Sequence, residues 1–203
     1  MPEILPALAN RRARRAFARQ PVPPHVQEVL WRAVALAPSH GNTQPSRLLV
    51  ADTPETKAAL FDALSEGNRN WAGAAPLLVV LAADPAHDTT GKNWDGSERE
   101  LWALHAGIAL GNLLAQATEL GLVAHPMAGF DERSVRAVFG IPSRVRVLSV
   151  IAIGYPGDPS TLPEDLQAKE NAEQQRLPLD LIVGSRWSEE LGTSARDRRK
   201  REA

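Results

Sequence analysis

The chain contains no cysteine and a single tyrosine among its 203 residues. Without thiols it can form no disulfide, no thiolate metal site and no cysteine nucleophile. Its net charge of −1 also gives it no overall charge excess of the kind that draws proteins to nucleic acids or membranes. No apolar run reaches the roughly 18 residues of a membrane helix, and the opening MPEILPALANRR has no apolar core of signal-peptide length. We therefore expect a cytoplasmic protein without a membrane or nucleic-acid partner.

Several functional motifs are missing as well. No Gly-x-Gly-x-x-Gly follows an apolar run of strand length, so nothing supports a Rossmann dinucleotide site. The histidines lack the spacing of metal ligands, so we predict no metal, and sequence order alone supports no Ser–His–Asp triad. The composition, 43% apolar and 23% charged, is ordinary for a globular protein. We expect one domain over 1–203, of which about 188–203 form a flexible charged tail.

Apolar periodicity predicts helices and strands in irregular alternation, without the repeated strand–helix–strand order of a doubly wound sheet. Helices are expected at 24–37, 54–65, 97–120 and 131–139, and strands at 47–51, 77–82 and 146–155, with a short strand or turn at 122–124, a polar loop at 84–96 and a short apolar segment at 176–183. Thr53 is the expected cap of the second helix, and Gly140 the expected end of the fourth. The run LLVVLA at 77–82 is apolar throughout, which predicts a strand covered on both faces.

The helix at 97–120 is apolar on more than one side, which predicts burial nearly all round. Small residues recur every four positions along one of its ridges, at Ala103, Gly107, Gly111 and Ala115. Small side chains at that spacing let another helix approach closely. In a chain of this size the pattern favours a partner subunit, and a central helix in a compact monomer is the alternative.

Five arginines lie within RRARRAFAR, from Arg11 to Arg19. Like charges this close together repel, so they are more stable beside an anion. Because a guanidinium binds phosphate through two hydrogen bonds, a phosphate monoester is a natural partner. The alternative is a solvated basic segment or a weak nucleic-acid patch. Phe17 and the prolines that follow it favour an ordered segment.

The segment from Ala37 to Pro45, APSHGNTQP, combines a stiff backbone with short polar side chains. Its two internal prolines and its glycine fix an irregular conformation. Ser39, Asn42 and Gln44 then present hydroxyl and amide groups at set positions. The segment suits a flat ligand with polar edges better than it suits a simple connection.

In their order along the chain, RRARRAF, APSHGNTQP and RLLVA resemble the start of the FMN-dependent nitroreductase family. GAAPLLVVLAA, HAGIALGNLLAQATELGLVAHPMAGFD, VFGIP, IAIGYP and RLPLDLIV resemble later landmarks of that family, so the resemblance spans about 10–187. The resemblance implies an α+β fold, a nitroreductase-like three-layer sandwich with a mainly antiparallel sheet flanked by helices. It also implies an intertwined homodimer with FMN at the subunit interface.

The resemblance assigns site residues position by position. Arg11, Arg12 and Arg176 match phosphate contacts, and Arg15 matches a cation at the pyrimidine edge of the flavin. The full set implied at FMN is Arg11, Arg12, Ala13, Arg15, Pro38, Ser39, Asn42, Gln44, Asn68, Pro126, Met127, Ala128, Gly129 and Arg176, of which Pro38, Ser39 and Asn42 match a loop that reaches the flavin from the second subunit. The chain departs from the family pattern at Ala13, where serine is usual, at Ala128, where many members carry glutamate, and at Gln174, where a basic residue is frequent.

The implied activity is electron transfer from NADH or NADPH, through FMN, to nitroaromatics, quinones or similar electron-poor acceptors with ping-pong kinetics. No catalytic residue of the protein is expected, because the flavin carries the chemistry. His40 and Trp94 are candidate contacts to the acceptor. Alternatives are a reductive dehalogenase or a flavin-modifying member of the same superfamily and, in another class, a non-enzymatic protein that binds anions or nucleic acid.

Overall fold

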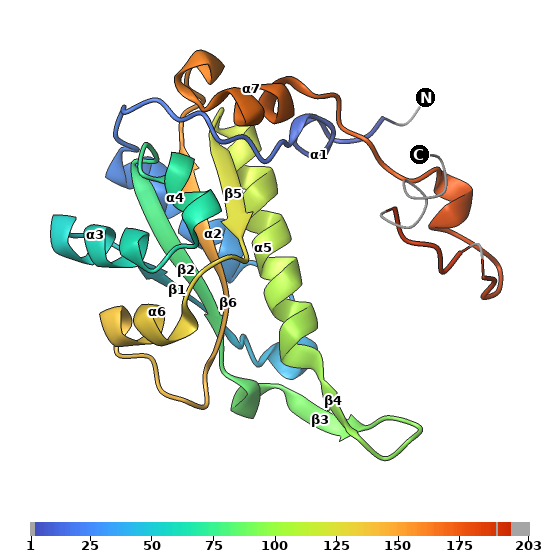
Figure 1. Cartoon of the computed structure of the whole chain (residues 1–203). Coiled ribbons are helices and arrows are strands. Elements are labelled where there is room, and N and C mark those ends of the chain that lie inside the picture. The colour runs from blue at the N-terminus through green and yellow to red at the C-terminus, as the bar shows by residue number, and fades with distance from the viewer. Residues whose placement is uncertain (1–2, 190, 196–203) are drawn as a thin grey trace. The chain divides into compact units, whose positions relative to one another are not determined.

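An antiparallel sheet lies at the centre of the unit formed by residues 1–171 (Figure 1). The computed structural model of the chain describes residues 3–189 and 191–195. The sheet has the strand order β1–β2–β6–β5. Its strands are β1 (Ser46–Val50), β2 (Leu77–Ala83), β5 (Val123–Met127) and β6 (Arg146–Gly154). Every residue of β2 is buried, which confirms the prediction of a strand covered on both faces.

Because side chains alternate along β2, its residues contribute to two separate apolar clusters, one on each face of the sheet. Val79 packs with Leu30 of α2 (Pro24–Ala35) and Leu113 of α5 (Leu101–Glu119) on one face. Leu78 and Val80 pack on the other face, against helices α3, α4 and α6. Those helices span Pro54–Asp62, Glu66–Ala72 and Glu132–Phe139. Helices therefore lie on both faces of an antiparallel sheet, as the α+β prediction requires.

Local sequence signals set several helix ends. Thr53 caps α3 in a capping box, because its hydroxyl accepts from the Thr56 N–H and the Thr56 hydroxyl accepts from the Thr53 N–H. Asp131 caps α6 by accepting from the N–H groups of Arg133 and Ser134. Gly140 ends α6 in the left-handed conformation, with φ of 63°. The predictions for Thr53 and Gly140 are confirmed.

The segment around residues 84–100 differs from its prediction. Part of the expected loop is strand β3 (Thr89–Lys92), and the first residues of the expected long helix are strand β4 (Glu98–Glu100). A turn joins the two strands, with Gly96 at φ of 84° and a hydrogen bond of 2.8 Å from the Asn93 N–H to the Ser97 carbonyl. Pairing between the strands thus replaces the first helical turn, so α5 begins at Leu101.

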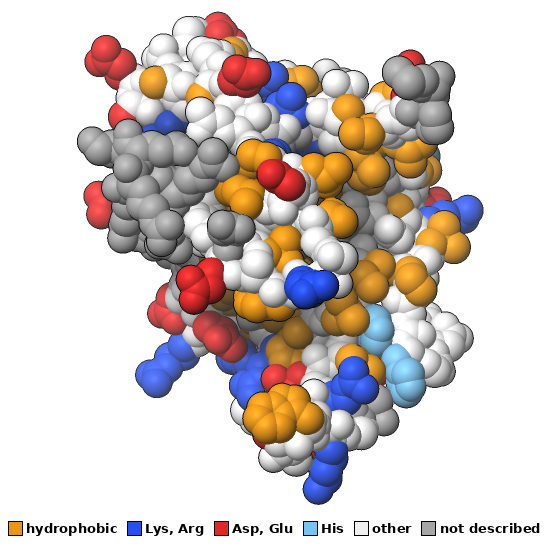
Figure 2. All heavy atoms as spheres, turned by 90° about the vertical axis from the view of Figure 1, so that its right-hand side faces the viewer, with side chains coloured by type: hydrophobic (Ala, Val, Ile, Leu, Met, Phe, Trp, Pro, Cys, Tyr) orange, Lys and Arg blue, Asp and Glu red, His pale blue; other side chains and the backbone are white. Residues whose placement is uncertain are grey.

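Within the single chain, helix α5 is buried on one side only, so burial all round would need the predicted partner subunit. One face packs on the sheet, but Ala103, Leu104, Gly107 and Gly111 are exposed, with Leu104 59% exposed. The apolar surface of α5 is wider than the part that one sheet can cover. Apolar side chains gather over this side of the molecule (Figure 2). The predicted partner subunit remains a prediction.

Helices α1 (Pro6–Asn10), α4 and α7 (Glu164–Asn171) are absent from the sequence prediction. They have five, seven and eight residues, which is too short to show an apolar periodicity. Two predicted helices are also shorter than expected, because α2 ends at Ala35 and α3 at Asp62, while β5 extends through Met127. None of the described helices is long and apolar enough to cross a membrane.

Residues 172–203 form a second compact unit. The predicted apolar segment lies in it and contains a short 3₁₀ helix, Leu179–Leu181, whose Leu179 is 73% exposed. Much of the expected charged tail, residues 190 and 196–203, lies outside the described residues.

Candidate functional site

The arginine-rich segment is ordered by a buried carboxylate. Glu170 of α7, only 8% exposed, accepts hydrogen bonds from the backbone N–H of Arg15 at 2.8 and 3.0 Å and of Ala16 at 3.2 Å. The segment then pairs with the end of β6, where the Gly157 N–H donates to the Ala16 carbonyl. A Cβ atom at Gly157 would lie 2.4 Å from the backbone of Phe17, so this close approach requires glycine. These contacts support an ordered segment over a solvated one.

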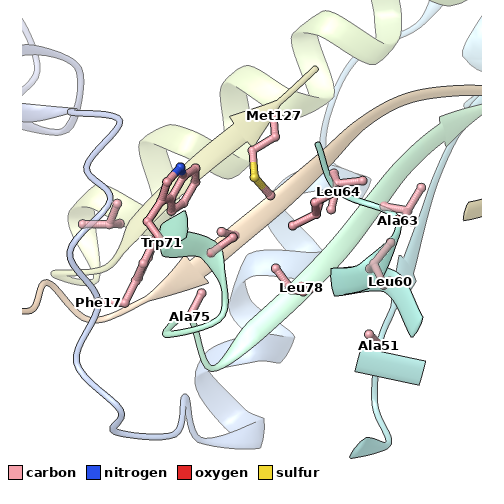
Figure 3. Packing of buried hydrophobic residues seen from close by; sticks show 14 of the residues in the cluster. Phe17, Ala51, Leu60, Ala63, Leu64, Trp71, Ala75, Leu78 and Met127 are labelled. Carbon is pink, nitrogen blue, oxygen red and sulfur yellow. The ribbon is translucent and has the colours of Figure 1, made fainter. Parts of the chain in front are cut away.

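His125 of β5 fastens the same segment to the sheet. Its Nδ1 donates to the Arg14 carbonyl at 2.9 Å, and its ring lies 4.5 Å from that of Trp71. Trp71 in turn stacks on Phe17 at 6.1 Å, and Figure 3 shows both rings in the core. Burial is the main cause that lowers the pKa of His125. The charges of Arg15 and Arg11 lower that pKa further, while the Arg14 carbonyl and Glu170 raise it.

The turn after β5 is held by α4. The Asn68 side-chain amide donates to the Gly129 carbonyl at 2.9 Å, and the Ser65 N–H donates to the same oxygen at 2.9 Å. A Cβ atom at Gly129 would lie 2.5 Å from the Ser65 hydroxyl. The structure therefore brings together Asn68 and Gly129, both of which the family resemblance assigns to the FMN site.

The neighbours of Gly129 differ in what they offer a ligand. Pro126 is half-buried, Ala128 is exposed, and the Met127 side chain packs in the core, where Figure 3 shows it. Met127 can therefore meet a ligand through its backbone alone. The small side chain of Ala128 leaves the turn open to solvent.

Around Arg12 the structure adds a detail that the sequence did not show. Its Nη1 donates to the carbonyls of Ala9 and Arg11, both at 2.9 Å, which holds the guanidinium against the end of α1. A guanidinium has five N–H donors, so several remain for an anion. Ala13 beside it is exposed. Arg176 lies in the second unit, where it donates to the Gln175 carbonyl.

The loop between α2 and β1 has a strained backbone. Gly41, Asn42 and Gln44 have φ values of 56°, 57° and 48°. The Ser39 hydroxyl accepts from the Gln44 N–H at 2.9 Å, so it is used to hold the loop together. Left-handed conformations at non-glycine residues cost about 1–2 kcal/mol each. Such strain is common at functional sites.

Two residues that sequence reasoning did not assign to the site support this loop. His105 of α5 accepts a hydrogen bond at its Nε2 from the His40 N–H, at 3.2 Å. Its Nδ1 is hydrogen-bonded to the carboxylate of Asp88, which is 2% exposed. The contacts join positions far apart in the chain, so no spacing motif could reveal them. His40 itself, a predicted acceptor contact, is partly exposed.

A cavity of about 280 Å³ lies behind the loop. It is lined by Trp31, Val34, Ala35, Ala37, Pro38, Ser39, Gln44, Pro45, Ser46, Arg47, Leu48, His105 and Ala109. Pro38, Ser39 and Gln44 thus share this cavity, and neither His40 nor the other residues predicted at FMN are part of its lining. Trp94 is 99% exposed in the turn of the β3–β4 hairpin.

The predicted residues of unit 1–171 form two groups. The loop at 38–45 lies near the start of α5, while the arginine segment lies near its other end (Figure 1). Among residues 3–171, no hydrogen bond joins the loop to Asn68 or Gly129. One chain therefore does not unite the two groups. In the described residues no cluster of histidine and carboxylate side chains has a geometry suited to a metal ion.

Comparisons with known proteins identify the family of the chain. The model of the Nitroreductase family matches residues 8–70 and 64–155. An NADH dehydrogenase of Thermus thermophilus is 32% identical over 87% of this chain and 93% of that protein. A Stenotrophomonas maltophilia protein provisionally named NADH dehydrogenase/NAD(P)H nitroreductase is 35% identical over 74% of this chain and 83% of its own length. A solved structure of an oxidoreductase containing FMN superposes with a TM-score of 0.79 and 30% identity, over 92% of this chain and 93% of that one. The chain belongs to the nitroreductase family.

Proposed function

We propose that the protein is a cytoplasmic, FMN-dependent homodimer that passes electrons from NADH or NADPH to small electron-poor acceptors such as nitroaromatics and quinones. The names of its relatives support the proposal, since one is an FMN-containing oxidoreductase and another an NADH dehydrogenase. The observation that carries it is the arrangement along β5. There the arginine segment and the Gly129 turn flank one strand.

The residues beside β5 fit a ligand with an anionic tail and a flat ring. His125 ties the arginine segment to the strand, and Gly129 lies four residues further on. An extended strand advances about 3.3 Å per residue, so the part of β5 from His125 to Met127 separates the two points by roughly 7 Å before the turn begins. Guanidinium groups at one end suit a phosphate. At the other end, a glycine without a side chain lets a ring approach the backbone.

Each residue of this group then has a task in holding the ligand. Arg11 and Arg12 would bind the phosphate, and Arg15 would lie at the pyrimidine edge. The family resemblance adds Arg176, which belongs to residues 172–203, as a further phosphate contact. The Gly129 backbone would face the reactive edge of the ring, with its orientation fixed by Asn68. When bound, FMN supplies the redox chemistry, taking a hydride equivalent from NAD(P)H and passing two electrons to an acceptor, so that the two substrates use the site in turn. A cation at Arg15 stabilises negative charge on the reduced ring.

The second half of the site comes, in this proposal, from the partner subunit. Ser39 and Asn42 lie near the start of α5, away from the arginine segment of their own chain (Figure 1). The exposed ridge of α5 supplies a surface on which a second copy could pack. Beside it, α1, α2 and α5 enclose a groove of about 730 Å³ whose lining includes Leu36, which is 80% exposed. Two copies packed there would bring the loop of each to the arginine segment of the other.

The chemical class of the electron acceptor can be tested by experiment. The exposed Ala128 would leave the bound flavin open to solvent, which favours varied acceptors over one enclosed substrate. Reductive dehalogenation and flavin modification are the alternatives within the superfamily, and an acceptor screen with product identification separates them. The order that Glu170 and His125 impose on the arginine segment favours a ligand site over a solvated nucleic-acid patch.

One absorbance spectrum of the purified protein tests the proposal. We expect flavin bands after mixing with FMN and desalting, and their bleaching when NADH or NADPH is added without oxygen. Reoxidation by a quinone or a nitroaromatic compound should then restore the bands. A protein that keeps no flavin through the desalting column contradicts the proposal. Size-exclusion chromatography with light scattering tests the dimer in the same sample.

A further inference from the structure

His105 and Asp88 form a buried pair that the proposed flavin chemistry does not use. Their exposed fractions are 8% and 2%. His105 lies on α5, and Asp88 lies just before β3, at the root of the hairpin. Each buried polar group needs a partner, and these two satisfy one another through His105 Nδ1 and a carboxylate oxygen. The pair joins the hairpin to the helix.

The hydrogen bonds define the tautomer of His105. The His40 backbone N–H can only donate, so the His105 Nε2 that it meets at 3.2 Å carries no proton. Nδ1 then carries the proton and donates to Asp88. A carboxylate that fixes the tautomer and ring direction of a histidine is a common way to aim its other nitrogen. Here that nitrogen is aimed at the backbone of the loop at 38–45.

The hydrogen bond between the His40 N–H and His105 lies next to the most strained part of the loop at 38–45. Gly41 and Asn42, directly after His40, are left-handed, and the Asn42 N–H bonds back to the Ser39 carbonyl at 3.1 Å. Among the described residues, every other hydrogen bond of the segment Ser39–Thr43 stays within the loop 39–44. The contact from His105 is therefore what fixes this segment to the body of the protein by a hydrogen bond.

We propose that His105, oriented by Asp88, is a positioning residue that holds Ser39 and Asn42 in the conformation that binds FMN, an inference that rests on the proposed function. A second group faces the pair. The His40 Nδ1 lies 3.9 Å from the other Asp88 oxygen, which has no hydrogen-bond partner among the described residues. Asp88 thus lies beside both histidines, with one carboxylate oxygen hydrogen-bonded to His105 and the other 3.9 Å from His40 Nδ1.

The test compares variants of the full chain that differ at Nε2. His105→Phe keeps a ring of similar shape without an acceptor, while His105→Gln restores a carbonyl oxygen that can accept from the His40 N–H. Leu110→Ala, on the same helix but packed on the sheet side, is the control for general loss of stability. Hydrogen exchange of the apo protein reports on residues 39–44, and titration with FMN reports on affinity.

We expect His105→Phe to speed exchange in residues 39–44 and to weaken FMN binding, each by about tenfold, the value of one net hydrogen bond. His105→Gln should recover part of both losses, and Leu110→Ala should lower the melting temperature with neither effect. Unchanged exchange and affinity in His105→Phe, or equal losses in Leu110→Ala, overturn the inference.

Two further outcomes are decisive. If His105→Phe does not fold, Asp88→Asn replaces it, because an amide no longer fixes the tautomer and the same two losses are expected. Wild-type affinity and exchange in that variant overturn the inference. If the wild-type chain binds no FMN, the proposed function fails by itself, and the exchange data alone decide whether His105 holds the loop.

Discussion

The side-chain amide of Asn68 meets the carbonyl oxygen of Gly129 at 2.9 Å, so that α4 holds the turn that follows β5. The Ser65 N–H shares the same oxygen. Because the Gly129 carbonyl oxygen accepts two hydrogen bonds, its peptide unit cannot rotate freely. The direction of the backbone at Gly129 is thereby set before any ligand arrives, which lowers the entropy cost of binding.

Asn68→Ala removes one of the two donors to Gly129. We expect a loss of about 1 kcal/mol in the free energy of unfolding, and weaker FMN binding because the turn becomes free to rotate. Urea denaturation measures the first effect and FMN titration the second. Asn70→Ala is the matched control, since Asn70 is exposed on the same helix. Equal FMN affinity in the two variants would show that the turn needs no support from α4.

Glu170→Gln tests the anchor of the arginine segment. A glutamine offers one oxygen where two now accept from Arg15 and Ala16, and its amide group would face a backbone N–H. Leaving a buried donor unsatisfied costs about 1–3 kcal/mol. We expect a lower melting temperature and faster proteolysis within residues 11–19. Glu164→Gln, at an exposed position of the same helix, should change neither; similar losses in both variants would remove the special role of Glu170.

The sequence predicts the arginine segment itself, but it does not predict the Glu170 carboxylate that holds this segment in place. The motif RRARRAF marked the arginines, and local rules marked Thr53 and Gly140, because those signals lie within a few residues of the structure they create. Glu170 lies 155 positions from Arg15, on a short polar helix without apolar periodicity. Contacts of that kind depend on how the whole chain folds back on itself, which no local pattern records.

The same reasoning explains what was wrong at α5. Residues 97–100 include no apolar side chain, and pairing of Glu98–Glu100 with β3 competes successfully with the first helical turn. The width of the apolar surface on α5 was readable from sequence, but which part faces the sheet and which faces solvent was not. Likewise the sequence placed Ser39 and Asn42 in one stiff loop, but His105 and Asp88 beneath it became visible only in three dimensions.

His125 gives the fold a dependence on pH. Burial lowers its pKa in the folded state below the value of about 6.5 that an exposed histidine has. Between those two values the unfolded chain binds more protons, so protons favour unfolding. The stabilising contribution is complete above about pH 6.5 and is lost as the pH falls toward the folded-state pKa.

His125→Phe separates this contribution from that of the other histidines. It keeps a ring against Trp71 but cannot titrate. We expect a lower stability at neutral pH, by about 1 kcal/mol for the lost bond to the Arg14 carbonyl, and a smaller decline in stability between pH 7 and 5. Denaturation curves at several pH values measure both. An identical decline in wild type and variant would mean that His125 is not the titrating group.

The paired substitution Arg11→Ala with Arg176→Ala tests the phosphate contacts, one in each unit. Hydrogen bonds to a charged group contribute about 1.5–3 kcal/mol each, so the double variant should release FMN on a desalting column while remaining folded by circular dichroism. Arg19→Ala with Arg186→Ala removes the same charge from exposed positions and should retain the flavin. Retention of FMN by both double variants would mean that the phosphate is bound elsewhere.

A large side chain placed on the small-residue ridge of α5 has opposite expected effects in a dimer and in a monomer. In the single chain, a Cβ atom added at Gly107 or Gly111 meets nothing within 4 Å. If α5 faces solvent, Gly111→Leu should stabilise the helix by up to about 1 kcal/mol, as expected from helix propensity. If the ridge packs against a second copy, Gly111→Leu should block close approach, lower the oligomeric state seen by light scattering and weaken FMN binding. Ala58→Leu, at an exposed position of α3 on the other face of the sheet, adds an apolar side chain away from the ridge and serves as the control. A stabilised Gly111→Leu variant with unchanged mass and full FMN affinity would remove the ridge from the interface, and with it the argument that Ser39 and Asn42 serve the partner's site.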